Sequence, residues 1–187
     1  MLNLKKRIAE ARQNDEGFTL IELAVVILII GILLALALPA FLGVRKNAAD
    51  KAAQSAVRVA LLNAKSNYSD SGSYVNANPT NLQAAEPGVV YNDGAIASPV
   101  ASTDSKTVSI SVSNASAATG DAKQVFRAAA LSKSSGKCYL IQDNTASSAV
   151  GPTQGTTQWV ALNLAGGCLA PTGTTDPAGF TLVPTTA

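Results

Sequence analysis

The stretch FTLIELAVVILIIGILLALAL, residues 18–38, decides how the rest of the chain is organised. Its 21 residues carry a single charge, Glu22. At about 1.5 Å of rise per residue, a helix of this length crosses the ~30 Å hydrocarbon core of a bilayer. The stretch therefore predicts a transmembrane helix near the N-terminus.

Basic residues precede this helix at Lys5, Lys6, Arg7 and Arg12. Because positive residues beside a span tend to stay in the cytoplasm, they orient the helix. We expect a single-pass protein of the plasma (inner) membrane with a cytoplasmic N-terminus. Everything after Leu38 is expected outside the cytoplasm.

The start of the helix carries a second signal, the sequence GFTLIE at residues 17–22, preceded by Glu16. An ordinary secretory signal has a short apolar core followed by its cleavage site, whereas here the apolar run is long and follows the candidate site. The motif resembles the class III processing signal of type IV prepilins. The resemblance implies that a prepilin peptidase cuts between Gly17 and Phe18, that Phe18 is then N-methylated, and that residues 1–17 are a leader peptide.

Glu22 is the main physical anomaly of the apolar stretch. Ionisable residues inside a membrane helix are costly and tend to have partners and functions. Cleavage would create an amine on Phe18, one helical turn away. The resemblance implies that Glu22 neutralises the amine of a neighbouring subunit during assembly. The alternative is that Glu22 lies in the headgroup region and is merely solvated.

Gly31 and Pro39 weaken the same helix. Glycine lowers helix stability, and proline removes a backbone donor and clashes with the preceding turn. Pilins have a Gly and a Pro at these positions relative to the cleavage site, and the resemblance implies a kink or local unwinding in the filament. Alternatively, both are ordinary residues of a membrane helix, which tolerates them.

An amphipathic helix is predicted over residues 39–70, with Gly72 just beyond its end. Small apolar residues recur at spacings of three and four, which predicts one face packed on a sheet. These residues are Ala49, Ala53, Ala56, Val57, Ala60, Leu61 and Ala64. The polar surface is predicted to comprise Arg45, Lys46, Asp50, Lys51, Arg58 and Lys65.

Residues 71–187 are predicted to form a β-rich head. Residues 107–113 alternate apolar and polar side chains, as in a half-buried strand. Further strands are predicted at residues 89–91, 125–131, 138–142 and 158–164. The expected fold is thus α+β and type IV pilin-like, a long helix packed on a small antiparallel sheet. LSKSSGKCYLI at residues 131–141 and LQAAEPGVVY at 82–91 resemble, less specifically, the heads of Gram-positive, actinobacterial pilins.

The chain has two cysteines, Cys138 and Cys168, and no histidine. In an oxidising compartment two such cysteines most simply form a disulfide, here closing the loop 138–168. The alternative is a pair of buried thiols in a reducing cytosol. No metal-ligand spacing, nucleotide loop or nucleophile motif is present, so we expect neither cofactor, metal nor enzymatic activity.

The resemblance implies a structural subunit, a major pilin, that polymerises as a homo-oligomer into a helical type IV pilus. The pilus would lie on the cell surface and serve adhesion, motility or DNA uptake. Implied partners are the peptidase, an assembly ATPase, a platform protein and, before assembly, the membrane. Nucleic acid would enter only through DNA uptake, which the sequence does not indicate.

Two other hypotheses stay open. One is a minor pilin or a pseudopilin of type II secretion or competence, which would share the whole N-terminal signal. The other is a signal-anchored extracytoplasmic binding protein, which would be neither cleaved after Gly17 nor assembled.

Overall fold

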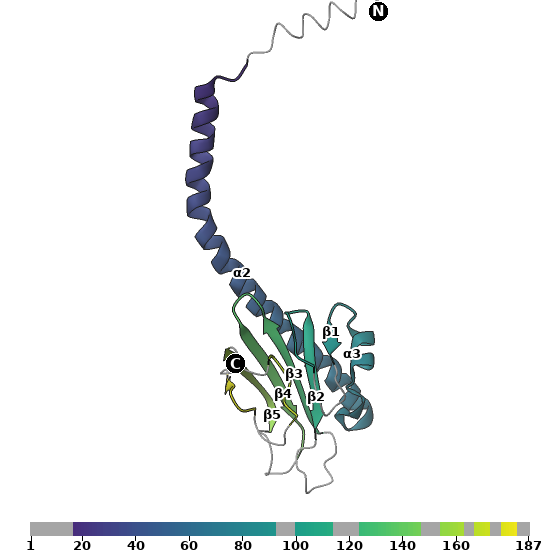
Figure 1. The fold of residues 1–187 in the computed structure, drawn as a ribbon. Coiled ribbons are helices and arrows are strands. Elements are labelled where there is room, and N and C mark those ends of the chain that lie inside the picture. The colour runs from purple at the N-terminus through teal and green to yellow at the C-terminus, as the bar shows by residue number, and fades with distance from the viewer. Residues whose placement is uncertain are drawn as a thin grey trace, which may run out of the picture. The chain divides into compact units, whose positions relative to one another are not determined.

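The structure is a computed structural model that describes residues 17–92, 100–113, 124–146, 154–162, 167–172 and 177–182. The fold is α+β and type IV pilin-like: a long helix, α2 (Leu20–Ser71), and a six-stranded sheet (Figure 1). The chain divides into two compact units, residues 1–43 and 44–187, which are described separately. Most of the predicted leader lies outside the described residues.

The described part of the first unit consists of residues 17–19 and the first part of α2. Its side chains are exposed throughout, and most of them are large and apolar. By length and composition α2 can cross a membrane. The helix continues through both Gly31 and Pro39. The predicted kink or unwinding at these two residues stays a prediction.

The second unit, which we call the head, contains the rest of α2 and the sheet. The strands are β1 (Val90–Asn92), β2 (Thr107–Ser113), β3 (Val125–Ser132), β4 (Lys137–Asn144), β5 (Gly155–Leu162) and β6 (Thr181–Leu182). They lie in sequence order across the sheet. Two short helices, η1 (Tyr74–Asn76) and α3 (Pro79–Ala85), lie between α2 and β1 in the chain.

The sheet differs from the expected antiparallel arrangement in one pair. β1 and β2 are parallel, and the other neighbours are antiparallel. Parallel neighbours need a crossover of about a dozen residues or more, and residues 93–106 are long enough to supply it. The strand predicted at 158–164 begins earlier, at Gly155, and residues 163 and 164 lie outside the described residues.

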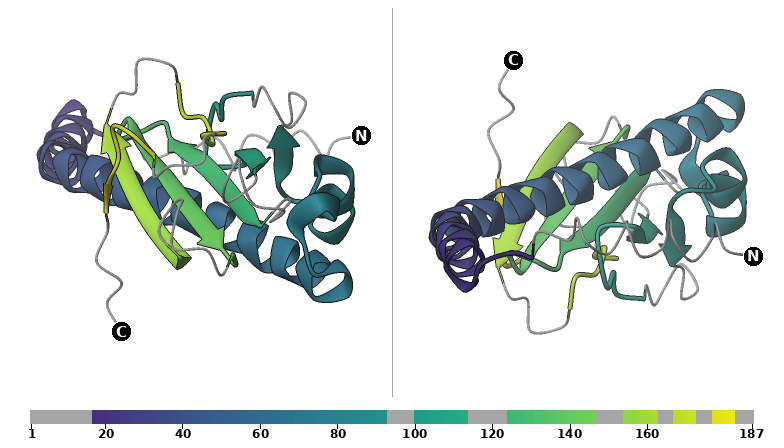
Figure 2. Two further views of the ribbon diagram at one scale, coloured as in Figure 1. Left: turned by 90° about the horizontal axis from the view of Figure 1, so that it is seen from below. Right: turned by 90° about the horizontal axis from the view of Figure 1, so that it is seen from above.

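The head's main core lies between α2 and one face of the sheet (Figure 2). The predicted apolar face of the helix is buried there, apart from Ala49, which is half-buried. Alanine dominates this face, and its small side chain lets the helix approach the strands closely. The helix contributes Ala53, Ala56, Val57, Ala60, Leu61 and Ala64, and the strands contribute residues such as Val108, Ile110, Val112 and Phe126.

The prediction that β2 is half-buried is wrong, because both of its faces are covered. The segment 167–172 lies over the second face: the Ala170 amide donates to Ser109 Oγ at 3.1 Å, and Ser111 Oγ donates to the Pro171 carbonyl at 2.7 Å. Side chains in β2 therefore alternate between two buried faces, one lined by valine and isoleucine and the other by serine. The hydrogen bonds offset the cost of burying the hydroxyl groups.

The predicted disulfide between Cys138 and Cys168 tethers this covering segment to β4. The two Cα atoms are 5.4 Å apart. Around the disulfide lies a second apolar cluster that includes Leu140, Trp159 and Ala170. The bridge thus joins the centre of the sheet to a segment without regular secondary structure.

Candidate processing and assembly site

The described residues begin with the predicted cleavage site. Gly17, Phe18 and Thr19 precede the first turn of α2, and all three are exposed. An added Cβ on Gly17 would meet nothing within 4 Å. Exposed backbone outside regular structure is the form in which proteases cut chains. The two residues of the predicted cleavage site thus lie exposed, outside the helix.

Thr19 and Glu22 form a reciprocal cap at the start of α2. The Thr19 amide donates to Glu22 Oε2 at 2.9 Å, and Thr19 Oγ1 donates to the same oxygen at 2.6 Å. In return, the Glu22 amide donates to Thr19 Oγ1 at 3.3 Å. This is a capping box, in which a Thr and a Glu three residues later satisfy backbone donors that the first helical turn leaves open. The Glu22 carboxylate thus has a structural partner before cleavage.

The sequence analysis missed this second role of Glu22. The signal was present, since Thr19-Leu20-Ile21-Glu22 has the T-x-x-E spacing of a capping box immediately before an apolar run. The cap leaves acceptor capacity on the carboxylate, because both hydrogen bonds from Thr19 go to Oε2 and a carboxylate can accept about four hydrogen bonds. Oε1 is left to accept a donor from a neighbour.

Asp50 contradicts the prediction that it belongs to the polar surface of α2. It is only 9% exposed, at the end of the sheet where the turn between β3 and β4 meets the helix. Its Oδ1 accepts hydrogen bonds from Ser132 Oγ at 2.6 Å and from Ser135 Oγ, while Lys137 Nζ lies 3.1 Å from Oδ2. Asp50 therefore fastens the β3–β4 turn to the helix.

The environment of Asp50 stabilises its charged form. Burial alone would raise the pKa of this carboxyl group. The hydrogen bonds from Ser132, Ser135, Lys137 and Tyr139 outweigh burial and lower the pKa to about 2. Asp50 is therefore ionised wherever the protein is folded at ordinary pH.

A second acidic residue, Asp143 on β4, joins the far end of the helix to the sheet. Lys65 Nζ lies 3.0 Å from its Oδ1, and the hydroxyl groups of Tyr74 and Thr156 donate to its two oxygens. Burial works against ionisation of Asp143, but these donors lower its pKa on balance. Burial, followed by the hydrogen bond to Asp143, raises the pKa of Tyr74. Lys65 therefore belongs to this contact more than to the predicted solvent face.

Among the described residues no group of three His, Cys, Asp or Glu side chains is arranged to hold a metal ion. The two acidic contacts are closed by serine, threonine, tyrosine and lysine side chains. They hold the helix on the sheet, and each lies far along the chain from the predicted cleavage site.

Comparison with known families identifies the N-terminal region. The model of the prokaryotic N-terminal methylation motif matches residues 12–38, which include Gly17, Phe18, Glu22 and Gly31. No curated protein and no solved structure matches the chain significantly. The match ends before Pro39, so the resemblance of the head to actinobacterial pilins stays a prediction.

The motif and the fold together define the class of this chain. Its N-terminus carries a type IV prepilin-like, class III signal. A long helix with an apolar first half follows it, and the second half of that helix packs on a mostly antiparallel sheet. The head that contains this sheet also contains a disulfide. The chain is thus a type IV pilin-like protein, of the kind that includes pilins and pseudopilins.

Proposed function

We propose that this chain is a structural subunit of a type IV pilus, cut between Gly17 and Phe18, N-methylated at Phe18 and polymerised into a surface filament. One observation carries the proposal: the methylation motif leads directly into the first part of α2, whose apolar side chains are all exposed up to Val44. A surface of this size needs a cover. Lipid covers it before assembly, and the helices of other copies cover it afterwards.

The first half of α2 is suited to both environments. Ala24, Gly31 and Ala35 lie on one face of it at spacings of seven and four, beside Ile27 and Leu28. Small residues at such spacings let helices approach closely in the absence of water. Gly31 and Pro39 supply the points at which the helix bends or unwinds when it leaves the bilayer.

Glu22 serves assembly in this proposal. Cleavage after Gly17 places a positive amine on Phe18, and the amine of an incoming subunit would enter an apolar filament core. The Glu22 carboxylate of a neighbour neutralises it through the oxygen that the cap does not use. A prepilin peptidase, an assembly ATPase and a platform protein act on the subunit in this scheme.

The subunit begins as a single-pass protein of the plasma membrane with its N-terminus in the cytoplasm and ends in an extracellular pilus. Its role is structural and not enzymatic. The filament serves adhesion, motility or DNA uptake. A minor pilin or pseudopilin is the second candidate, because the matched motif covers only the segment that all these subunits share.

Two variants of the capping box can distinguish the charge of Glu22 from its role in starting the helix. Glu22→Gln removes the charge, but glutamine still accepts the Thr19 hydrogen bonds of a capping box. Thr19→Val does the opposite, because it removes the hydroxyl group of the cap and keeps the charge. Filaments are counted by electron microscopy of cells making each variant, and leader removal is checked by mass spectrometry.

We expect Glu22→Gln to be processed normally but to reduce filament number by about tenfold or more, since an amine would be buried without its partner. Thr19→Val should keep most filaments. A loss of filaments in Thr19→Val with normal numbers in Glu22→Gln would assign Glu22 to helix capping. Normal filaments from processed Glu22→Gln would refute electrostatic docking.

A further inference from the structure

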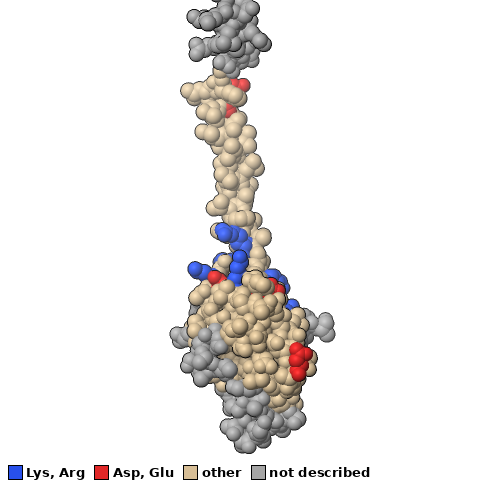
Figure 3. Space-filling view, turned by 90° about the vertical axis from the view of Figure 1, so that its right-hand side faces the viewer, with Lys and Arg blue, Asp and Glu red and all other residues tan. Residues whose placement is uncertain are grey.

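Exposed basic side chains gather at one end of the head, where its part of α2 begins (Figure 3). We call this set the basic collar. It comprises Arg45, Lys46 and Lys51 on the helix, Lys106 before β2, and Lys133 and Lys137 at the turn between β3 and β4. Five of these side chains are exposed, and Lys137 is half-buried.

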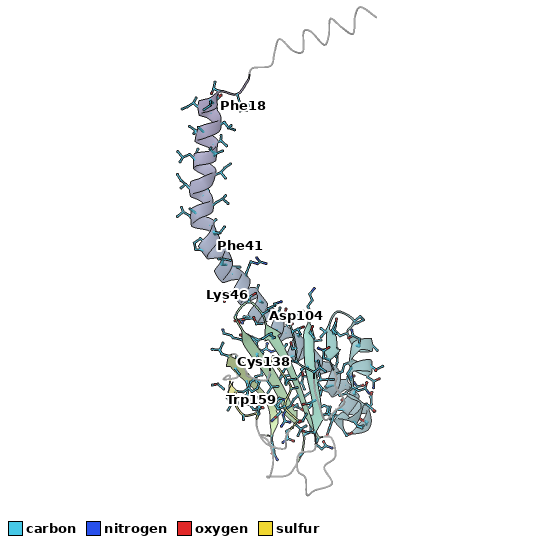
Figure 4. The ribbon with its side chains drawn as sticks, viewed as in Figure 1. Phe18, Phe41, Lys46, Asp104, Cys138 and Trp159 are labelled. Atoms are coloured by element: carbon cyan, nitrogen blue, oxygen red, sulfur yellow. A yellow bond between two sulfur atoms is a disulfide. The ribbon has the colours of Figure 1, made fainter. Side chains whose placement is uncertain are left out.

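A salt bridge joins two of the collar's segments, and local hydrogen bonds shape the third. Lys137 pairs with Asp50, between Lys46 and Lys51 on the helix. Asp104 accepts hydrogen bonds from the backbone amides of Lys106 and Thr107 at 2.8 and 2.9 Å. Lys46 and Asp104 lie at the same end of the head (Figure 4).

The collar has a positive surplus of charge. In the part of the chain that the structure describes, its six cations are accompanied by two carboxylates, Asp50 and Asp104, which leaves four positive charges. Both carboxylates already accept hydrogen bonds from the head itself. Of the other described carboxylates of the head that reach solvent, Asp70 lies at the opposite end of its helix and Glu86 directly follows α3. The described exposed charges of the head are thus mainly positive at the collar.

The position of the collar along the chain indicates a partner. Arg45 follows Leu38 by seven residues, a helical rise of about 10 Å. The headgroup layer on one side of a bilayer is about 5 to 8 Å thick. Asp50, which holds Lys137, is about 8 Å further along the helix. Arg45 and Lys46 are therefore the collar residues on the helix within a Debye length of the headgroups at physiological salt. The start of the collar thus lies along the helix at the range over which charged headgroups act.

We propose that the basic collar binds the anionic lipid headgroups of the outer leaflet and holds the head of the unassembled subunit on the membrane surface. The inference rests on the proposed outward orientation of the head. Each cation near such a surface strengthens binding roughly fivefold. Removal of the leader with Lys5, Lys6, Arg7 and Arg12 would leave the collar as the main basic flank of the span.

The test uses the uncleaved full-length chain in vesicles, so cleavage and filament formation do not influence it. One set of vesicles contains phosphatidylcholine alone, and the other contains added phosphatidylglycerol. A membrane-impermeant acetylating reagent modifies the lysines of outward-facing heads, and mass spectrometry gives the rate at each lysine. Lys65, which pairs with Asp143 outside the collar, is the internal control.

We expect phosphatidylglycerol to slow acetylation of Lys46, Lys106 and Lys133 several-fold and to leave Lys65 unchanged. High salt should abolish the difference, because the attraction is screened. Lys46→Gln with Lys106→Gln should abolish most of the protection of Lys133, because each lost cation weakens binding to the anionic surface by roughly fivefold. Arg58→Gln, an exposed helix position outside the collar, is the matched control and should leave protection of Lys133 largely intact.

Equal rates in the two kinds of vesicle would overturn the proposal. Protection in phosphatidylcholine vesicles that grows with protein density would assign the collar to contacts between copies. Protection there by inorganic phosphate would indicate a site for free anions, and protection only by added duplex DNA would indicate nucleic acid. Each of these results would identify a partner other than the lipid surface and would overturn the proposal.

Discussion

The contact made by Asp50 leads to the sharpest prediction about the stability of the head. Asp50→Asn keeps the shape of the side chain but removes its charge. The amide cannot pair with Lys137, and it presents one acceptor oxygen instead of two. The amide oxygen can still accept from Ser132 and Ser135, which both donate to Oδ1, but the amide nitrogen then faces Lys137 Nζ in place of Oδ2. The β3–β4 turn should be held less firmly to the helix.

The pKa of Asp50 sets the size of the effect. A carboxyl group whose pKa falls from 3.8 to about 2 on folding contributes about 2 kcal/mol to the free energy of unfolding at neutral pH. The side chain is 12% exposed, so solvent screening reduces this figure little. Asp50→Asn should therefore lower the free energy of unfolding by about 2 kcal/mol at pH 7.

The same reasoning sets the pH dependence. Because the pKa of Asp50 is lower in the folded state, its contribution is fully present above the unfolded pKa of 3.8 and is lost as the pH falls towards about 2. The difference between the wild type and Asp50→Asn should shrink over that range. Between that range and the alkaline pH at which Lys137 loses its proton, the difference should be constant, since the contact with Asp50 raises the pKa of Lys137.

Trp159 provides the assay. It is the only tryptophan of the chain, and it is buried beside the disulfide. Its fluorescence during urea unfolding in detergent micelles reports on the head. Asp70→Asn, an exposed acidic position on the same helix, should change the free energy by less than about 0.5 kcal/mol. A loss in Asp50→Asn that is equally small, or that persists unchanged at low pH, would refute the reasoning.

Two further predictions concern other parts of the chain. Gly17→Ala should be processed poorly and Gly17→Leu should keep the full precursor mass when co-expressed with a prepilin peptidase; normal trimming of the bulky variant would disprove the assigned cleavage site. Reducing the bridge between Cys138 and Cys168, whose sequence separation is 30, should lower the free energy of unfolding by at most roughly 3 to 4 kcal/mol. Full alkylation of both thiols in unreduced protein would exclude that bridge.

The features that could be predicted from the sequence are those with a local period. The buried face of the second half of α2 follows a helical repeat, so residues such as Ala53 and Ala60 could be assigned to the core before the fold was known. Strand β2 was predicted with its observed bounds for the same reason. The capping box of Thr19 and Glu22 is also a local signal, but the charge of Glu22 in an apolar run points first to an intermolecular role.

The features that could not be predicted depend on contacts distant in sequence. Asp50 looks like a solvent-facing residue on its own helix, because Ser132, the first of its partners, comes 82 residues later. Ser109 in β2 looks exposed for a similar reason. The segment that covers it is brought back by Cys168, and nothing in the local pattern shows where that segment runs.

The most direct test of the central claim is the intact mass of this chain in filaments sheared from the surface of its source cells. A subunit that begins at Phe18 and carries one methyl group on its amine is the predicted result. It would show cleavage after Gly17, methylation and export into a filament in one measurement. A chain that keeps residues 1–17, or that is present in the membrane but absent from surface filaments, would contradict the account.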